Sequence, residues 1–186
     1  MNKICFKIMG GGNKTEMKNQ ADEHFKALRQ IVPEVHRLML FDYDSEGSYH
    51  PDGKNPASAE WKRKNIENYL LVPDAWKRSA LQEMGFQDDD LFAQPALQVI
   101  DQFFANEALT LPHGQRWRDV RASAFGAVDG KRMLFENNDS LFQLLREGPP
   151  PVTLLREQVA LNMTADEIHE DVHEFIGKVI ALAGSN

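Results

Sequence analysis

Two carboxylates that follow an apolar run are the residues of this sequence best placed to do chemistry. Asp42 and Asp44 come directly after residues 38–41, which read as a buried strand. In an extended chain, residues two apart point to the same side, so the two carboxylates project together. Crowded carboxylates repel each other at neutral pH unless a cation lies between them or one of them keeps its proton. The pattern therefore predicts a divalent metal site.

The segments before this acidic pair predict the fold that positions it. Residues 4–9 have the pattern of a strand and end at three glycines, residues 10–12. Apolar residues then recur at helical spacing after Thr15, which can cap this helix, and they stop at Pro33. Strand, glycine loop, helix and strand make a βαβ unit with parallel strands, so the loop and the acidic pair emerge at one edge of the sheet. Open α/β sheets bind ligands at that carboxyl edge.

One further strand is predicted after the acidic pair. A long polar loop at residues 45–58 leads into a basic segment and a third strand within residues 61–72. Pro73 suits the first turn of a helix that runs to about Met84, and Gly85 ends it. These elements would complete an α/β core over residues 1–84.

The remaining sequence, residues 85–186, is predicted to be mostly helical and to complete this core or pack on it. The last helix has the clearest start, because Thr164 and Glu167 form the pattern of a capping box ahead of regularly spaced apolar residues. The earlier helices are expected at residues 95–105, 140–146 and 152–162.

The composition excludes several classes of protein. The 186 residues, of which 42% are hydrophobic, are enough to bury a core. No apolar stretch approaches the ~20 residues of a membrane span, and the N-terminus lacks the pattern of a signal peptide. The single cysteine, Cys5, cannot form an internal disulfide, which is compatible with a reducing compartment. A cytoplasmic protein without membrane contact is therefore expected.

A local basic surface is the feature that would allow nucleic acid to bind. The net charge of −7 argues against indiscriminate coating of nucleic acid but does not exclude a basic groove. Trp61 and Trp76 are available for stacking beside such a groove. The alternative for the charged residues is an ordinary solvated face. The candidates for contact with the phosphate backbone are Lys62, Arg63, Lys64, Lys77 and Arg78.

Three motifs resemble those of a known family. The acidic pair in D-Y-D, the glycines at residues 10–12 and the segment N-I-E-N-Y at residues 65–69 resemble the Toprim domain that ends overcoming-lysogenization-defect (OLD) nucleases and related AAA/ABC-type ATPases. The segment at residues 162–168 also resembles the closing helix of these proteins. The resemblance implies an α/β fold with a Toprim-like, mainly parallel sheet and a helical C-terminal region.

The same resemblance implies a site and partners. On this sequence it assigns Asp42, Asp44 and Glu67 as ligands of Mg²⁺ or Mn²⁺, with Asn65 as an accessory polar ligand. Lys131, in D-G-K, would lie near the scissile phosphate and stabilise the transition state. The implied activity is hydrolysis of DNA phosphodiesters in an anti-phage or DNA-repair system. An ATPase domain or subunit, upstream or in trans, would be the partner, and a homo-oligomer is compatible with this arrangement.

One departure from the Toprim pattern affects the expected activity. Toprim domains begin with a strand and a Glu-Gly turn whose glutamate is a metal ligand, and no residue before Gly10 supplies it. Glu16, the first acidic residue, falls in the predicted helix. The chain therefore resembles a Toprim domain without its first strand, as a fragment of a longer ATPase or a natural truncation. The contrasting hypothesis is a non-catalytic module that docks on an ATPase or binds DNA without cutting it.

Three alternative interpretations lack part of the pattern that they require. A haloacid dehalogenase-type phosphatase would use Asp42 as nucleophile and Asp44 as acid/base and would enlist further carboxylates from residues 88–90, but the usual Asp-Gly-Thr continuation is missing. The H-E-x-x-H pattern at residues 169–173 lacks a third zinc ligand downstream. Residues 10–15 lack the spacing of a P-loop.

Overall fold

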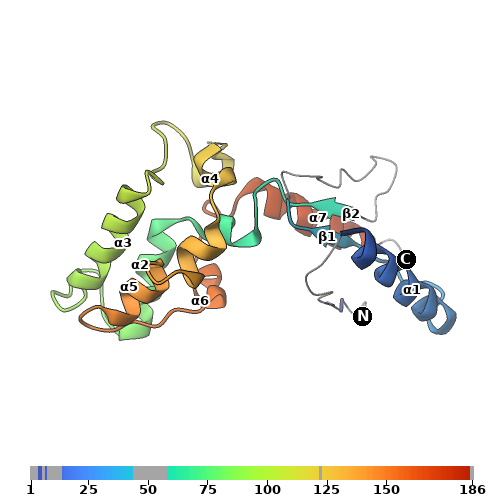
Figure 1. The fold of residues 1–186 in the computed structure, drawn as a ribbon, viewed down its shortest axis with the longest axis horizontal. Coiled ribbons are helices and arrows are strands. Elements are labelled where there is room, and N and C mark those ends of the chain that lie inside the picture. The colour runs from blue at the N-terminus through green and yellow to red at the C-terminus, as the bar shows by residue number, and fades with distance from the viewer. Residues whose placement is uncertain (1–3, 6, 8–13, 44–57, 122, 185–186) are drawn as a thin grey trace.

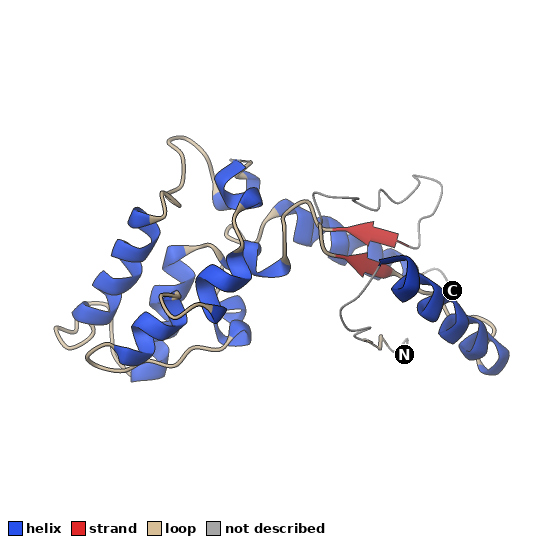
Figure 2. Cartoon of the chain, in the orientation of Figure 1, coloured by secondary structure: helices blue, strands red, loops and turns tan. Residues whose placement is uncertain are grey.

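The computed structural model describes residues 4–5, 7, 14–43, 58–121 and 123–184 (Figure 1). These residues form a mixed α/β structure in which helices predominate and the sheet is small (Figure 2). A helical lobe lies at one end of the molecule, and the sheet lies at the other end with the first and last helices. None of the helices in the described ranges is long and apolar enough to cross a lipid bilayer.

Within the described ranges, the sheet consists of two short parallel strands. β1 (Met39–Phe41) pairs with β2 (Ser58–Glu60), with Met39 opposite Ser58 and Phe41 opposite Glu60. The predicted strand before the acidic pair is thus confirmed. The strand that pairs with β1 is β2, which follows it in sequence. The predicted partner was a strand at residues 4–9, of which the described residues 4, 5 and 7 are not in a strand. The α/β class is established at this coarse level.

The first helix lies beside the sheet. α1 (Lys14–Ile31) confirms the predicted helix, although it begins at Lys14 and so includes Thr15. Its Ala21 joins Met39 and Phe41 of β1 in a small buried cluster. Asp22 accepts hydrogen bonds from Lys18 at 2.8 Å and Arg37 at 2.6 Å, and these two cations lower the pKa of its carboxyl. The second contact ties α1 to the segment that leads into β1.

The predicted third strand within residues 61–72 is wrong. Residues 66–70 form a 3₁₀ helix, η1 (Ile66–Leu70), in which Glu67, Asn68 and Tyr69 are buried one after another. A strand would turn successive side chains to opposite faces, whereas here every one of these polar side chains has a partner distant in sequence. Asn68 is fully buried and donates to the carbonyls of Phe125 and Val128, both at 2.9 Å. Tertiary hydrogen bonds therefore decide this segment.

The helical lobe contains most of the core. α2 (Pro73–Met84) matches its prediction and ends at Gly85, which has a left-handed φ of 71°. α3 (Gln94–Asn106) and α5 (Leu141–Glu147) also form where helices were expected. The buried cluster extends from Leu71 to Val159, so residues on both sides of position 84 contribute to it. The short elements of this lobe are η2 (Trp117–Asp119), α4 (Ser123–Ala127) and the π-helical turn η3 (Arg132–Glu136).

Two later helices begin further along the chain than predicted. α6 (Arg156–Leu161) is shorter than residues 152–162, because residues 152–155 are not helical and Val152 and Leu154 are buried in the segment ahead of the helix. α7 (Glu170–Ala183) has His169 as its cap residue, so it begins about five positions after the helix predicted from a cap at Thr164. Glu167 does accept from the backbone N–H of Thr164 at 2.8 Å, but it also pairs with Arg78 of α2. This pairing holds the predicted capping box in a turn ahead of the helix.

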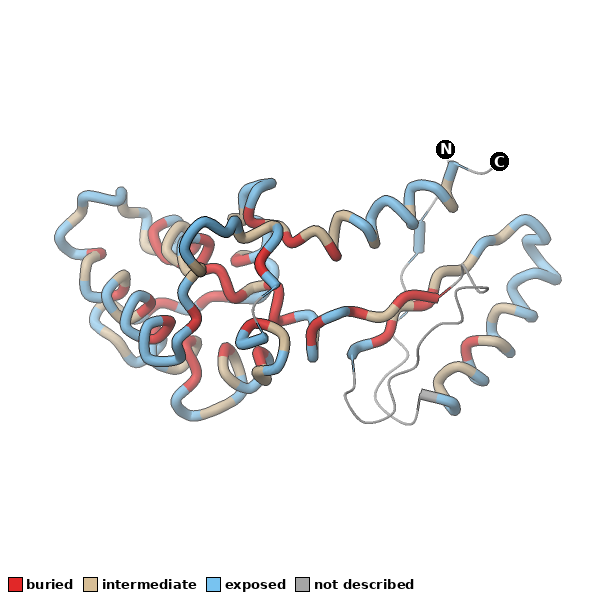
Figure 3. Tube along the Cα trace, turned by 90° about the horizontal axis from the view of Figure 1, so that it is seen from above, coloured by how far each residue is buried: buried red, intermediate tan, exposed pale blue. Residues whose placement is uncertain are grey.

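Burial differs between the two ends of the molecule. Figure 3 shows buried positions throughout the helical lobe and along the strands, and exposed positions over most of α1 and the C-terminal half of α7. α7 is attached to the chain after β2 through Trp61, whose ring centroid lies 5.4 Å from that of Phe175. The sheet end therefore depends on a few contacts.

Candidate functional site

The acidic pair follows β1 at the carboxyl end of the parallel strands. Asp42 comes directly after Phe41 and is exposed, while Asp44 lies outside the described residues. The backbone N–H of Trp61 donates to the carbonyl of Phe41 at 2.9 Å, so the pairing with β2 continues to the position just before Asp42. This is the edge at which α/β sheets bind ligands.

Glu67, the third predicted carboxylate, is held by the helical lobe. Its side chain is buried, and Oε1 accepts a hydrogen bond from Nε of Arg156 at 3.0 Å. Arg156 is the first residue of α6, and its guanidinium lies 4.5 Å from the ring centroid of Phe135. The carboxylate of Glu67 is thus neutralised by a cation from the protein itself.

Lys131 is near enough to Glu67 for the two charges to interact. Its ammonium pairs with Glu136 at 2.9 Å. The hydrogen bond that Lys131 donates to Glu136, with a weaker Coulombic contribution from Glu67, raises the pKa of Lys131. The structure therefore brings Glu67 and Lys131 within electrostatic reach of each other, although they are far apart in sequence. We refer to Glu67, Lys131, Glu136 and Arg156 as the η1–α6 charge cluster.

Asn65 has one side-chain atom without a partner. Its Nδ2 donates to Oδ1 of Asp129 at 3.2 Å, whereas its Oδ1 is buried and accepts no hydrogen bond within the described part of the chain. Asp129 also pairs with Lys64 at 3.1 Å. Burial alone raises the pKa of Asp129, but the hydrogen bonds from the Arg132 amide, Lys64 and Asn65 outweigh it and lower the pKa.

Asn68 holds the segment that carries Asp129 and Lys131. The backbone N–H of Gly130 donates to Oδ1 of Asn68 at 3.1 Å. A Cβ at position 130 would lie 2.6 Å from that oxygen, so only glycine fits there without movement. The D-G-K motif is therefore positioned by a residue of the N-I-E-N-Y motif, a contact that the sequence analysis did not identify.

The predicted basic surface is only partly available for binding. Arg63 is buried, donates to the carbonyls of Asn68 at 2.8 Å and Val120 at 3.2 Å, and stacks over the ring of Tyr69. Trp61 and Trp76 are also buried. The other four predicted cations each pair with a carboxylate: Lys62 with Asp171 and Glu174, Lys64 with Asp129, Lys77 with Asp74 and Asp101, and Arg78 with Glu167.

A buried polar cluster joins η1 to α7, and the sequence analysis did not find it. Asp171 accepts from the hydroxyl of Tyr69 at 2.9 Å and pairs with Lys62 at 2.7 Å. Burial raises the pKa of Asp171, but hydrogen bonds with His169, Lys62 and Tyr69 outweigh this effect and hold the pKa far below its usual value. Burial, followed by the charge of Asp171, raises the pKa of Tyr69 above its ordinary range. No local pattern signals these contacts.

The H-E-x-x-H residues have separate structural contacts. His169 precedes α7, where Nδ1 accepts from the N–H of Asp171 at 3.2 Å and Nε2 lies 3.1 Å from the carbonyl of Val120. Glu170 pairs with Arg118 at 2.6 Å. Because His169 lies outside the helix, it does not share a helical face with His173, as the zinc motif requires.

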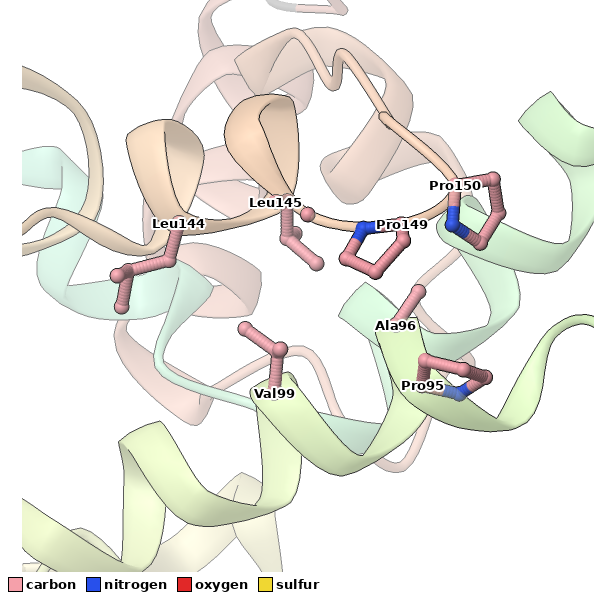
Figure 4. Close-up of a pocket in the computed structure, with 8 residues that line it drawn as sticks. Pro95, Ala96, Val99, Leu144, Leu145, Pro149 and Pro150 are labelled. Atoms are coloured by element: carbon pink, nitrogen blue, oxygen red, sulfur yellow. The ribbon is translucent and has the colours of Figure 1, made fainter.

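Neither of two hollows in the surface of the described residues offers free groups for the predicted chemistry. The hollow between α3 and α5 is lined by apolar side chains, among them Val99, Leu144 and Pro149 (Figure 4), and has no group suited to phosphodiester chemistry. The other lies between β2 and α7, where Lys62 already pairs with both Asp171 and Glu174. The acidic run at residues 88–90 lies in the turn between α2 and α3, at the far end of the molecule from β1.

The donors present are suited in type to a hard cation. Within the described ranges, no three His, Cys, Asp or Glu side chains are grouped so that they would hold a metal ion. Carboxylate and amide oxygens are nevertheless the ligands that Mg²⁺ and Mn²⁺ prefer. The buried Oδ1 of Asn65, which has no hydrogen-bond partner among the residues that the structure describes, is one such oxygen.

The chain was also compared with known proteins. Comparisons with models of protein families, with characterised proteins and with solved structures gave no match. The resemblance to the Toprim domain therefore stays a prediction from the motifs.

Proposed function

We propose that this chain is the Mg²⁺- or Mn²⁺-dependent, nucleic-acid-cleaving module of an ATPase-coupled system, with Asp42 and Asp44 as the principal metal ligands. The observation that supports the proposal most directly is the position of Asp42. It follows β1 at the carboxyl end of a parallel strand pair and is exposed there. That edge is where open α/β sheets bind their ligands.

The η1–α6 charge cluster and the neighbouring Asn65 supply the other proposed roles. Glu67 of the cluster would be a second ligand and Asn65 an accessory one, while the Lys131 ammonium would stabilise charge on the transition state. In support, Lys131 and Glu67 interact electrostatically, and Asn68 holds Gly130 beside η1. A bound divalent cation would neutralise phosphoryl oxygens and activate water.

Contacts with nucleic acid are proposed for the exposed lysines of the basic segment. Lys62 and Lys64 flank buried Arg63, and both are exposed although each pairs with a carboxylate. A phosphate backbone would compete with those carboxylates for the ammonium groups. The role proposed for the buried Arg63 is structural, because it holds η1 through its hydrogen bond to the carbonyl of Asn68.

The decisive experiment combines Mn²⁺ binding with nicking of supercoiled plasmid. Asp42→Ala is expected to weaken Mn²⁺ binding by about tenfold or more and to abolish nicking, because a first ligand is lost. Asp139→Ala is the matched control, since Asp139 is exposed and forms no ion pair within the described ranges. Unchanged Mn²⁺ binding and nicking in Asp42→Ala would rule out the proposed site.

A second candidate is the non-catalytic module that docks on an ATPase or on DNA. The observation that favours it is that Glu67 and Lys131 are both neutralised by partners within the chain, Arg156 and Glu136. Binding of DNA without nicking at any Mn²⁺ concentration would support this module. Hydrolysis of p-nitrophenyl phosphate without nicking would instead support the phosphatase chemistry of Asp42 and Asp44.

A further inference from the structure

The C-terminal end of α1 presents apolar side chains at the surface. Ile31 is 80% exposed, and Leu28 and Val32 are exposed as well. The N–H of Val32 donates to the carbonyl of Leu28 at 2.8 Å, so the helical turn continues to Val32 and the three side chains share one face. Arg29 lies one turn from both Lys26 and Val32, so two exposed cations flank this face. We refer to Lys26, Leu28, Arg29, Ile31 and Val32 as the α1 patch.

A second exposed apolar surface lies in the turn ahead of α3. Leu91 is 83% exposed and Phe92 is 75% exposed, and both directly follow the three aspartates at residues 88–90. The turn leads into the first turn of α3, where Pro95 lines one end of the apolar hollow between α3 and α5 (Figure 4). We refer to residues 88–92 as the turn patch.

The two patches carry opposite charges. Residues 25–32 contain two cations and no carboxylate, whereas residues 88–92 contain three carboxylates and no cation. Within the described ranges, neither Lys26, Arg29 nor any of the three aspartates forms an ion pair. Arg29 has a ring contact instead, with its guanidinium 5.9 Å from the centroid of Phe25. Each patch therefore combines apolar surface with charges that its own chain does not neutralise.

The patches lie too far apart to meet within one molecule. Figure 1 shows the C-terminal end of α1 at one end of the molecule and the turn between α2 and α3 at the other. Contact between them therefore requires two copies of the chain. Contact of two α1 patches would bring Lys26 and Arg29 against the same cations, and contact of two turn patches would bring aspartates together, so like charges disfavour both.

We propose that the α1 patch of one copy docks on the turn patch of a second copy, so that the chains associate head to tail. Ile31 and Val32 would cover Leu91 and Phe92, while the two cations face the aspartates. Burial of apolar surface would supply affinity, and the opposite charges would select the orientation. Such a heterologous contact leaves one patch of each kind open and repeats into a ring or an open chain. The inference does not depend on the proposed function.

The test is sedimentation velocity of the full chain at increasing concentration and low ionic strength, where charge steering is strongest. The mass of the natural chain is expected to rise with concentration beyond that of a dimer and to fall when salt is added. Ile31→Asp and Phe92→Asp should each weaken association at least about tenfold, because a charge enters the apolar contact.

Two further variants control for effects on the fold. Leu91→Asp is the second variant of the turn patch, because it keeps the contact between the rings of Phe86 and Phe92, whose centroids lie 6.5 Å apart. Leu161→Asp is the matched control: Leu161 is 84% exposed at the end of α6, outside both patches. This variant should associate as the natural chain does.

A mixture of two variants distinguishes head-to-tail docking from symmetric pairing. Equimolar Ile31→Asp and Phe92→Asp should form a dimer and no larger species, because the mixture offers one intact α1 patch to one intact turn patch. Dimers of Phe92→Asp alone would mean that α1 pairs with itself and would overturn the inference. A natural chain that stays monomeric at every concentration would overturn it too, and neither result bears on metal binding or nicking.

Discussion

At the scale of single residues, Gly130 shows how one atom constrains the segment that carries Lys131. Its backbone N–H donates to Oδ1 of Asn68, and this side-chain oxygen leaves no room for a Cβ at position 130. Asn68 is itself fully buried and has partners on Phe125 and Val128. Because each group in this contact is satisfied, displacement of one leaves a buried polar atom without a partner.

Gly130→Ala is expected to lower the free energy of unfolding by about 1–3 kcal/mol, because the new methyl group must push against Asn68. Gly126→Ala is the matched control: a Cβ there meets nothing within 4 Å, and the residue lies in α4. That variant should stay within about 0.5 kcal/mol of the natural chain or gain stability. Urea denaturation measures both, and equal effects of the two substitutions would contradict the explanation.

At the scale of elements, α7 depends on its first turn for attachment. Asp171 joins that turn to Tyr69 and Lys62, and His169 joins it to the carbonyl of Val120. Phe175 adds the contact with Trp61. The carboxylate of Asp171 therefore links α7 to the segment between β2 and α2.

Asp171→Asn is expected to lower the free energy of unfolding at neutral pH by about 1–3 kcal/mol. The ion pair with Lys62 is lost, and the hydroxyl of Tyr69 no longer donates to a charged acceptor. The folded chain holds the pKa of Asp171 below its value in the unfolded chain, about 3.9. This contribution to stability is present above that value and is lost as the pH falls below it. Urea denaturation from about pH 6 to pH 3 should show a smaller acid-induced loss in Asp171→Asn than in the natural chain. A parallel pH dependence in the two proteins would contradict this role, and Asp139→Asn is the exposed control.

Elements with local signals were predicted well, and those that depend on distant partners were not. Pro73 and Gly85 mark the two ends of α2 by backbone geometry alone, so its bounds follow from the sequence. The apolar, β-prone run within residues 61–72 has no such local limit. Its conformation depends on where Asn68 and Arg63 find partners: Arg63 bonds to Asn68 within the segment, and the other partners, Val120 and Phe125, lie beyond residue 119.

At the scale of the whole molecule, stability is concentrated in the helical lobe. The larger buried cluster lies in and around α2, α3 and α5, whereas Ala21, Met39 and Phe41 form the buried cluster beside the sheet. Two-stranded sheets have little stability of their own. The sheet end therefore relies on α1, and on α7 through Trp61.

Hydrogen exchange should reveal this difference. Amides in α2 and α3 are expected to exchange at least about tenfold more slowly than those in α1, because α1 has few buried side chains. Mass spectrometry of peptic fragments measures this under native conditions. Equal protection of α1 and α2 would show that the sheet end is as stable as the lobe.

The sequence by itself determined the α/β class, the strand that precedes Asp42, most helices and the chemical type of the proposed ligands. These depend on periodicity, turn residues and side-chain chemistry, all of which act within a few positions along the chain. Only the tertiary structure decided that residues 66–70 form η1, that Arg63 is buried, and that Arg156 pairs with Glu67. Each of these outcomes depends on the cost of burying a polar or charged group without a partner, and that partner is supplied by a segment distant in sequence.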